Sequence, residues 1–273
     1  MRSIEKINHI VCVASGKGGV GKSTTAVNLA LALSTLGRKV GILDADIYGP
    51  SLPLMMGVAD GTRPKIHDKK FMLPLLAHGI ECNSMGFLVD QKTAMVWRAP
   101  MIISAFNQML NDTVWSELDY LIVDMPPGTG DIQLSLVQSV KVSGAVIVTT
   151  PQDVALSDAR KGIEMFKKVD VPILGVVENM SMHTCTNCGH EEAIFGTGGG
   201  DSLSAEYSVE VIGRLPLDLT IRETTDLGNP VVASKPDHVA TKAYIELAKN
   251  VEQQLLASTP SNSEGPTITI SDD

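Results

Sequence analysis

The sequence predicts a doubly wound α/β fold in which a mostly parallel sheet carries helices on both faces. Short apolar runs alternate with segments of helical periodicity, and Gly-rich or Pro-rich connections separate them. A glycine-rich loop joins the first apolar run to the first helical segment. Continuous apolar runs are typical of strands buried on both faces, as parallel strands are. With 273 residues and 44% apolar composition, the chain is large enough to bury a sizeable core.

The predicted elements alternate along most of the chain. Strands are expected where apolar runs occur, over residues 10–14, 39–43, 79–85, 118–124, 144–149, 171–177 and 209–214. Helices are expected where apolar residues recur at helical spacing, over residues 23–36, 101–110, 132–140, 155–168, 219–227 and 238–256. Gly37 and Pro100 are typical of a helix end and a helix start. Loops are expected over 47–57 and 178–200, and 58–78 is expected to be irregular except for a short strand near 71–73.

Charge and hydropathy exclude several classes of protein. The chain has 22 basic and 31 acidic residues, a net charge of −9, and no Lys/Arg cluster of the kind that binds nucleic acid or anionic lipid. No apolar run approaches the roughly 20 residues that span a bilayer. The N-terminal segment lacks the apolar core of a signal peptide, and four cysteines do not make a disulfide scaffold. We therefore expect a reduced, cytoplasmic protein with neither nucleic acid nor membrane as partner.

The strongest local signal is a phosphate-binding loop that matches G-x-x-x-x-G-K-[ST]. It consists of Gly16, Lys17, Gly18, Gly19, Val20, Gly21, Lys22, Ser23 and Thr24. Glycines let successive backbone N–H groups converge on phosphate oxygens, and the following helix N-terminus adds free donors. The motif predicts that Lys22 reaches the β- and γ-phosphates of ATP and that the Ser23 hydroxyl binds Mg²⁺. Asp124 ends a later strand, where a carboxylate is expected to hold the same Mg²⁺.

Lys17 follows the first glycine, where phosphate binding by one chain needs no lysine. In this respect the loop resembles that of the deviant Walker A ATPases. The resemblance implies a homodimer in which Lys17 reaches the partner's nucleotide. Asp44 and Asp46 follow the second strand, at the same edge of the sheet. By the same resemblance Asp46 orients the attacking water and Asp44 lies nearer the Mg²⁺, so Lys17, Lys22, Asp46 and Asp124 are the predicted catalytic residues.

Cys185 and Cys188 form a C-x-x-C pair within the expected loop at 178–200. A structural zinc or an iron–sulfur cluster normally takes four protein ligands, and the sequence shows a single such pair. Three interpretations remain open: two chains join their pairs, a nearby His183 or His190 completes a zinc site, or the thiols do redox work. Cys12 and Cys82 lie inside predicted strands and are interpreted as buried apolar residues.

Taken in order, these motifs resemble the Mrp/ApbC family of iron–sulfur cluster carrier ATPases. The resemblance rests on the phosphate loop, on residues 44–51, 124–131 and 178–181, and on the cysteine pair, and it covers roughly residues 8–256. It implies a homodimer that holds a four-iron, four-sulfur cluster between the paired cysteines, receives it from upstream donors and passes it to apo-proteins. It also implies that Asn179 contacts adenine and that Pro216 lines the base pocket.

Length, composition and the order of the predicted elements indicate how the chain is organised. We expect a single P-loop ATPase domain over residues 1–257, with a metal-binding loop at 178–200. Residues 258–273 are rich in Ser, Thr, Pro and Asp, which is typical of a disordered acidic tail.

Two other functions share the loop. A zinc-bridged ATPase that targets hydrophobic membrane-protein segments needs an exposed apolar client groove. A MinD/ParA-like positioning ATPase needs a basic face or an amphipathic anchor. The acidic composition disfavours the second.

Overall fold

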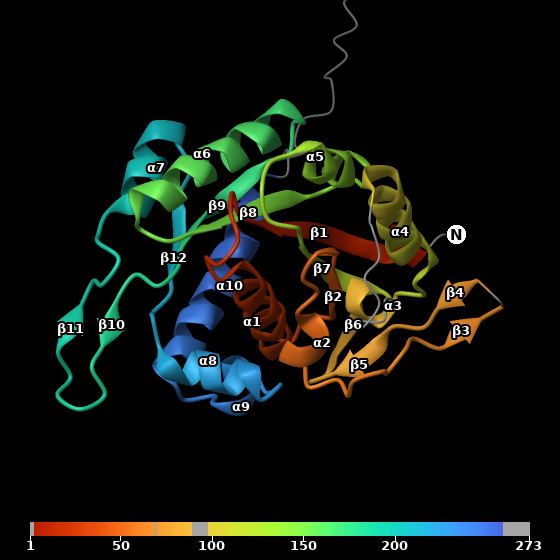
Figure 1. Cartoon of the computed structure of the whole chain (residues 1–273), viewed down its shortest axis with the longest axis horizontal. Coiled ribbons are helices and arrows are strands. Elements are labelled where there is room, and N and C mark those ends of the chain that lie inside the picture. The colour runs from red at the N-terminus through yellow and green to blue at the C-terminus, as the bar shows by residue number, and fades with distance from the viewer. Residues whose placement is uncertain (1–2, 69, 89–97, 259–273) are drawn as a thin grey trace, which may run out of the picture.

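A computed structural model describes residues 3–68, 70–88 and 98–258. Its centre is an eight-stranded sheet in the order β12-β9-β8-β1-β7-β2-β6-β5 (Figure 1). Within this sheet neighbouring strands are parallel, except that β5 pairs antiparallel with β6 at the edge. The strands are β1 (Ile7–Ala14), β2 (Val40–Asp44), β5 (Leu75–Ala77), β6 (Ile80–Ser84), β7 (Leu118–Asp124), β8 (Gly144–Thr149), β9 (Ile173–Glu178) and β12 (Val211–Arg214). The predicted mostly parallel sheet is confirmed.

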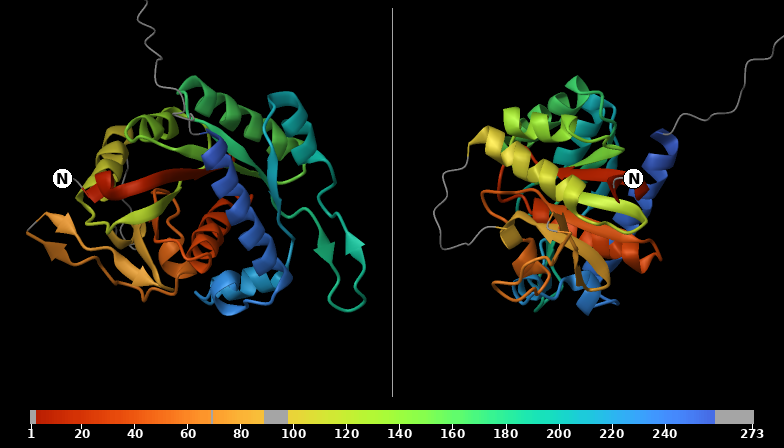
Figure 2. Two further views of the ribbon diagram at one scale, coloured as in Figure 1. Left: turned by 180° about the vertical axis from the view of Figure 1, so that it is seen from behind. Right: turned by 90° about the vertical axis from the view of Figure 1, so that its right-hand side faces the viewer.

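Helices cover both faces of this sheet, as Figure 2 shows. Alternate residues of β1 point to opposite layers: Val11 joins the core under α1 and α10, whereas Ile10 joins the core under α4, α5 and α6. The large helices are α1 (Lys22–Thr35), α4 (Ala99–Asp112), α5 (Asp131–Gln138), α6 (Asp153–Lys168), α7 (Gly199–Tyr207) and α10 (Val239–Ser258). Because both faces are covered, the central strands are fully buried, which explains their unbroken apolar runs.

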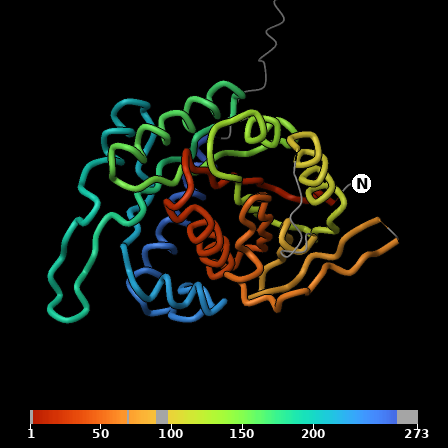
Figure 3. The backbone as a smooth tube through the Cα atoms, in the orientation of Figure 1, coloured from red at the N-terminus to blue at the C-terminus, as the bar shows by residue number. Residues whose placement is uncertain are grey.

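Shorter elements connect these layers. The small helices are η1 (Ser3–Lys6), α2 (Leu52–Met55), α3 (Met85–Leu88), α8 (Leu219–Asp226) and α9 (Val231–Ser234). Two small hairpins pair β3 (Ile66–His67) with β4 (Phe71–Met72), and β10 (His183–Thr184) with β11 (Glu191–Glu192). In the tube of Figure 3 the β10–β11 hairpin extends away from the layered body of the molecule. No helix in the described ranges has the length and apolar character needed to cross a bilayer.

The structure corrects three expectations about connections. The expected loop at 47–57 contains α2, because Ser51 stands at a helix start and Pro53 is tolerated in a first turn. The segment 58–78 was expected to be irregular except for a short strand near 71–73. That strand is present as β4, but the segment also contains β3, which pairs with β4, and the edge strand β5. The expected loop at 178–200 contains the β10–β11 hairpin and the start of α7. Of the predicted tail at 258–273, only Ser258 belongs to the described residues, where it ends α10.

Candidate functional site

The phosphate loop lies between β1 and α1, at the carboxyl end of the strand. Gly21 has a φ of 83° and immediately precedes α1, whose first turn has no side-chain cap. The uncapped N–H groups and the helix dipole make this end of α1 attractive to an anion. Gly16 packs against α6, and a Cβ at this position would lie 2.1 Å from the carbonyl carbon of Asp158. A side chain at residue 16 would therefore collide with the helix backbone.

Lys22 is buried at the start of α1 and is paired with the last residue of β7. Its Nζ lies 2.5 Å from Oδ1 of Asp124 and 3.1 Å from Oγ of Ser23. Burial raises the pKa of Asp124, while Lys22 and Ser23 oppose that shift because they favour the ionised carboxylate. The structure thus brings the predicted phosphate lysine, the predicted Mg²⁺ hydroxyl and the strand-end carboxylate together.

Asp44 ends β2, where its carboxylate is fully buried and held by three donors. Oδ1 accepts from the backbone N–H of Asp46 at 3.0 Å. Oδ2 accepts from the N–H of Leu52 at 3.2 Å and from the hydroxyl of Ser84 at 2.9 Å. Burial, and then the charge of Asp124, raise the pKa of Asp44 to about 7. Asp44 therefore holds together the two ends of the connection that runs from Asp46 to α2.

Asp46 lies within this connection and is 9% exposed. Its Oδ1 accepts from the N–H groups of Tyr48 at 3.2 Å and Gly49 at 3.3 Å, which is the local bonding of an Asx turn. Its charge also raises the pKa of Asp124, so the two carboxylates are close enough to interact. Lys17 is half-buried on the phosphate loop, and no ion pair of Lys17 occurs in the described part of the chain.

A pocket of about 240 Å³ opens beside the phosphate loop. Asn179 lines this pocket, and its Nδ2 donates a hydrogen bond to the carbonyl of Val20 at 2.8 Å. The Oδ1 atom of the same amide is therefore the one that can accept a hydrogen bond from a ligand. Pro216 lines the same pocket. The contact of Asn179 with adenine and that of Pro216 with the base stay predictions from the resemblance. The further lining residues are Gly21, Thr24, Met55, Met180, Leu217, Asp218, Ile221, Arg222, Thr225, Asp226 and Tyr244. Those from α2, α8 and α10 were missed, because only tertiary packing brings them beside the loop.

The cysteine pair lies at the tip of the β10–β11 hairpin, apart from the phosphate loop. The N–H of Cys185 donates to the carbonyl of His190 at 2.9 Å, and the N–H of Gly189 donates to the carbonyl of Cys185 at 2.8 Å. Cys185 is half-buried and Cys188 is exposed. Hydrogen bonds from the backbone of Asn187 and Cys188 lower the pKa of Cys185, which favours the thiolate that binds metals.

The other two cysteines do not join this pair. Cys12 and Cys82 are buried in β1 and β6, and burial raises the pKa of each thiol to about 12. The interpretation of both as buried apolar residues is confirmed. Within the described ranges, no group of three or more His, Cys, Asp or Glu side chains is arranged to hold a metal ion. A zinc site completed by His183 or His190 in the same chain is therefore not formed in this structure.

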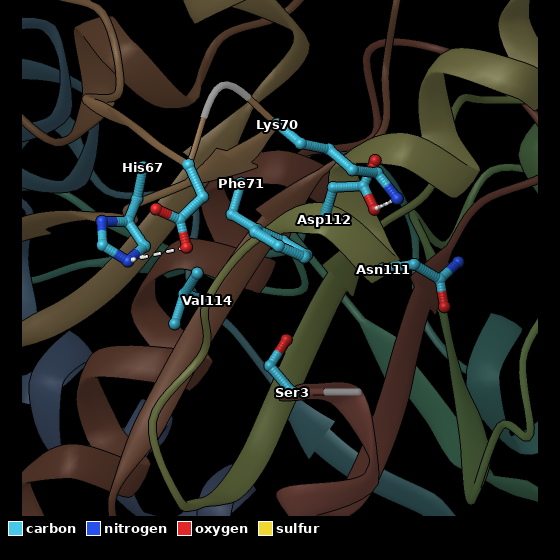
Figure 4. Close-up of a pocket in the computed structure, with 8 residues that line it drawn as sticks. Ser3, His67, Lys70, Phe71, Asn111, Asp112 and Val114 are labelled. Carbon is cyan, nitrogen blue, oxygen red and sulfur yellow. Dashed lines mark ion pairs between the residues drawn. The ribbon is translucent and has the colours of Figure 1, made fainter. Parts of the chain in front are cut away.

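A second cavity, of about 570 Å³, lies beside the β3–β4 hairpin (Figure 4). Its charged groups are already paired with one another. Lys70 lies 3.1 Å from Asp112, and His67 lies 3.4 Å from Asp68. Among the described residues that line this cavity, Lys70 is therefore already paired with Asp112, and the phosphate loop remains the better candidate site.

Comparison with known proteins assigns the chain to a family. The model of the NUBPL iron-transfer P-loop NTPases, in the ParA group, matches residues 6–252. The chain belongs to this family. The resemblance predicted from the motifs is confirmed, and the family's fold makes the protein a nucleoside-triphosphatase of the P-loop class.

Individual relatives agree with this assignment. The chain is 60% identical over 245 residues to the iron-sulfur cluster carrier protein of Pseudomonas fragi, covering 90% of this chain and 85% of that one. It is 51% identical over 259 residues to the iron-sulfur cluster transfer protein NUBPL of Mus musculus, covering 94% and 81%. Among solved structures, the nucleotide-binding protein of Archaeoglobus fulgidus in complex with ADP has a TM-score of 0.76 and 36% identity, covering 89% and 94%.

Proposed function

We propose that the protein is a homodimeric ATPase that carries an iron–sulfur cluster between two subunits and passes it to apo-proteins. The observation that carries the proposal is the cysteine hairpin. Each chain presents two thiols at its tip, Cys185 and Cys188, and the remaining cysteines are buried in strands. A four-iron, four-sulfur cluster takes four thiolates, which two copies of this hairpin would supply. The names of the relatives, cluster carrier and cluster transfer protein, support the same cargo.

The proposed binding and hydrolysis of ATP rest on buried side chains at the carboxyl ends of the strands, namely Lys22, Asp44 and Asp124. Lys22 would turn from Asp124 to the β- and γ-phosphates. It can reach them because it lies in the first turn of α1, directly after the phosphate loop. The partner subunit's Lys17 would add a second positive charge. Asp46 would orient the attacking water, because it lies on the connection held beside the phosphate loop by Asp44. Asn179 would accept from the amino group of adenine through Oδ1, with Pro216 against the base.

The donor set at this edge of the sheet fits Mg²⁺. The hydroxyl of Ser23 and the carboxylate of Asp124 are hard oxygen ligands that lie against the same ammonium group, so a divalent cation could replace that charge. Oδ2 of Asp44 accepts two protein donors, but Oδ1 accepts a single one and keeps a second lone pair, so ligation of Mg²⁺ by Asp44 through Oδ1 stays a prediction. When bound, Mg²⁺ neutralises charge on the β- and γ-phosphates.

Anaerobic reconstitution with iron and sulfide tests the cargo. The wild-type protein should become a brown dimer with about two irons per subunit, as one four-iron cluster between two chains requires. Cys185→Ala and Cys188→Ala should stay colourless, whereas Cys82→Ala, which removes a buried thiol, should colour normally. A colourless wild-type protein that retains zinc would contradict the proposal and favour a zinc-bridged targeting ATPase.

The partners follow from the cargo. Apo iron–sulfur proteins would receive the cluster, and upstream assembly proteins would supply it. Incubation of the reconstituted dimer with an apo-protein that needs a four-iron cluster should restore that protein's activity and bleach the carrier. A cytoplasmic location stays a prediction from the composition.

A further inference from the structure

Two segments that leave the carboxyl edge of the sheet pair with each other. Residues 178–183 continue from β9, and residues 215–217 continue from β12. The N–H of Leu215 donates to the carbonyl of Glu178 at 3.0 Å, that of Ser181 to Leu215 at 2.9 Å, and that of Leu217 to Met182 at 2.8 Å. We call these paired residues, 178–183 with 215–217, the ribbon.

One side of the ribbon forms a wall of the pocket beside the phosphate loop. Asn179, Met180, Pro216 and Leu217 all line that pocket. Asn179 also joins the ribbon to the phosphate loop through its hydrogen bond to Val20. Met180 has a φ of 56°, in the left-handed region that L-residues rarely adopt, so the ribbon is held there by its surroundings.

The far end of the ribbon is the start of the cysteine hairpin. His183 is the first residue of β10, two residues before Cys185, and its Nδ1 lies 3.0 Å from the carbonyl oxygen of Leu217. Since a carbonyl oxygen only accepts, Nδ1 must carry the hydrogen. One residue, Leu217, therefore contacts the pocket and accepts the side-chain hydrogen bond that fixes the base of the hairpin.

The longer segment that contains the hairpin, from the end of β9 to the start of α7, is also closed at its ends. Oε2 of Glu178 accepts from the N–H of Gly200 at 2.6 Å, so the residues on either side of the hairpin segment are joined. Glu178 is 3% exposed and also lies 3.6 Å from the guanidinium of Arg214 on β12. The hydrogen bond between His183 and Leu217 is therefore a direct side-chain contact between the ribbon and the first strand of the hairpin.

We propose that His183 is a positioning residue that fixes the cysteine hairpin to the wall of the nucleotide pocket, so that nucleotide binding and cargo binding are linked. This inference rests on the proposed function for the identity of both ligands. A ligand that orders the ribbon favours one orientation of the hairpin. If bound nucleotide changes the affinity for the cargo by some factor, linkage requires that bound cargo changes the affinity for nucleotide by the same factor. His183 acts through its hydrogen bond to Leu217 and needs no contact with either ligand.

Hydrogen exchange of the hairpin, with and without saturating MgADP, tests the link in cargo-free protein. The amide N–H groups of Cys185 and Gly189 are reporters, because both are hydrogen-bonded within the hairpin. In the wild type, MgADP should slow exchange of the peptide 181–192 by at least about 5-fold, the lower end of usual coupling. In His183→Phe the effect should fall below about 2-fold, whereas His183→Asn, whose Nδ2 takes the place of Nδ1, should keep it. His190→Phe, a matched change in the same hairpin, should also keep it.

The inference is overturned if MgADP leaves exchange of the hairpin unchanged in the wild type, a result that needs no variant to fold. It is equally overturned if His183→Phe retains the full effect. Failure of the proposed function looks different: the wild-type protein would take up no cluster on reconstitution, whatever the exchange shows. In a protein that does take up a cluster, cluster binding should change the dissociation constant for ADP by at least about 5-fold, and His183→Phe should lose that change.

Discussion

Ser84 donates its hydroxyl hydrogen to Oδ2 of Asp44 at 2.9 Å, between the paired last residues of β6 and β2. The same hydroxyl oxygen accepts from the N–H of Gly86 at 2.9 Å. Asp44 in turn binds the N–H groups of Asp46 and Leu52, so Ser84 acts on the connection that carries Asp46 without touching it. The conformation of this connection therefore depends on a residue from a different strand.

Ser84→Ala should lower kcat for ATP hydrolysis about tenfold, because the hydrogen bond to a buried carboxylate is lost and the connection holding Asp46 loosens. KM for ATP should change less than kcat, since the phosphate loop and the pocket beside it keep their contacts. Steady-state kinetics measure both. Ser143→Ala is the matched control: its hydroxyl accepts from the N–H of Ile10 at 3.1 Å, at the opposite end of the strands. Equal loss of activity in both variants would refute a specific role for Ser84.

Gly16→Ala should abolish nucleotide binding, lowering affinity for ADP at least about 100-fold, because the new methyl group would meet the backbone of Asp158 and displace the loop or α6. Gly162→Ala on α6 is the control, since a Cβ there approaches nothing nearer than Cγ2 of Thr129 at 4.0 Å. Isothermal titration with ADP compares the two. Tight binding by Gly16→Ala would show that the loop and α6 separate easily.

Lys17→Ala and Lys22→Ala should each be inactive or strongly impaired as ATPases when assayed alone. Mixed at equal concentration, they should regain activity up to about one quarter of wild type, because half of the dimers pair one intact Lys22 with the partner's Lys17. The assay is ATP turnover before and after subunit exchange. Mixtures no more active than their components, or a Lys17→Ala protein with normal turnover, would rule out a lysine that acts across the dimer.

The free energy of unfolding should carry a pH dependence from Asp44. Its pKa rises from 3.8 to about 7 in the folded protein, so the folded state holds a proton that the unfolded chain has released. This contribution is fully present below pH 3.8 and is lost as pH rises toward about 7. Asp44→Asn removes that titration, so its stability relative to the wild type should improve between about pH 4.5 and about pH 7.5. Urea unfolding at both pH values measures this, and a pH-independent difference would contradict the raised pKa.

Much of the fold follows from local pattern. Unbroken apolar runs predicted the buried parallel strands, and β1, β7 and β8 lie within a few residues of the predicted bounds. The glycine-rich loop and strand-end carboxylates predicted that Lys22 and Asp124 would meet, since the carboxyl ends of parallel strands share one edge. In these cases each segment carries its own sequence pattern, and the geometry of a parallel sheet then places the segments relative to one another.

The remainder depends on contacts between distant segments. The Ser84–Asp44 bond joins residues 40 positions apart, and Tyr244 reaches the pocket beside the phosphate loop from α10. The pairing of residues 178–183 with 215–217 has no periodic signature, because each segment is short and one contains a proline. Such relationships arise only when the helices have packed, so single-segment patterns do not contain them.

The depth at which Cys12 and Cys82 lie has a practical consequence for handling the protein. With pKa values near 12, both remain protonated at neutral pH, and a protonated, inaccessible thiol reacts slowly with oxygen or alkylating reagents. Among the four cysteines, damage by air should therefore fall on Cys185 and Cys188. A preparation exposed to oxygen would lose the ability to accept iron and sulfide while its core stays intact, so ATP turnover measured alone does not report on the integrity of the hairpin.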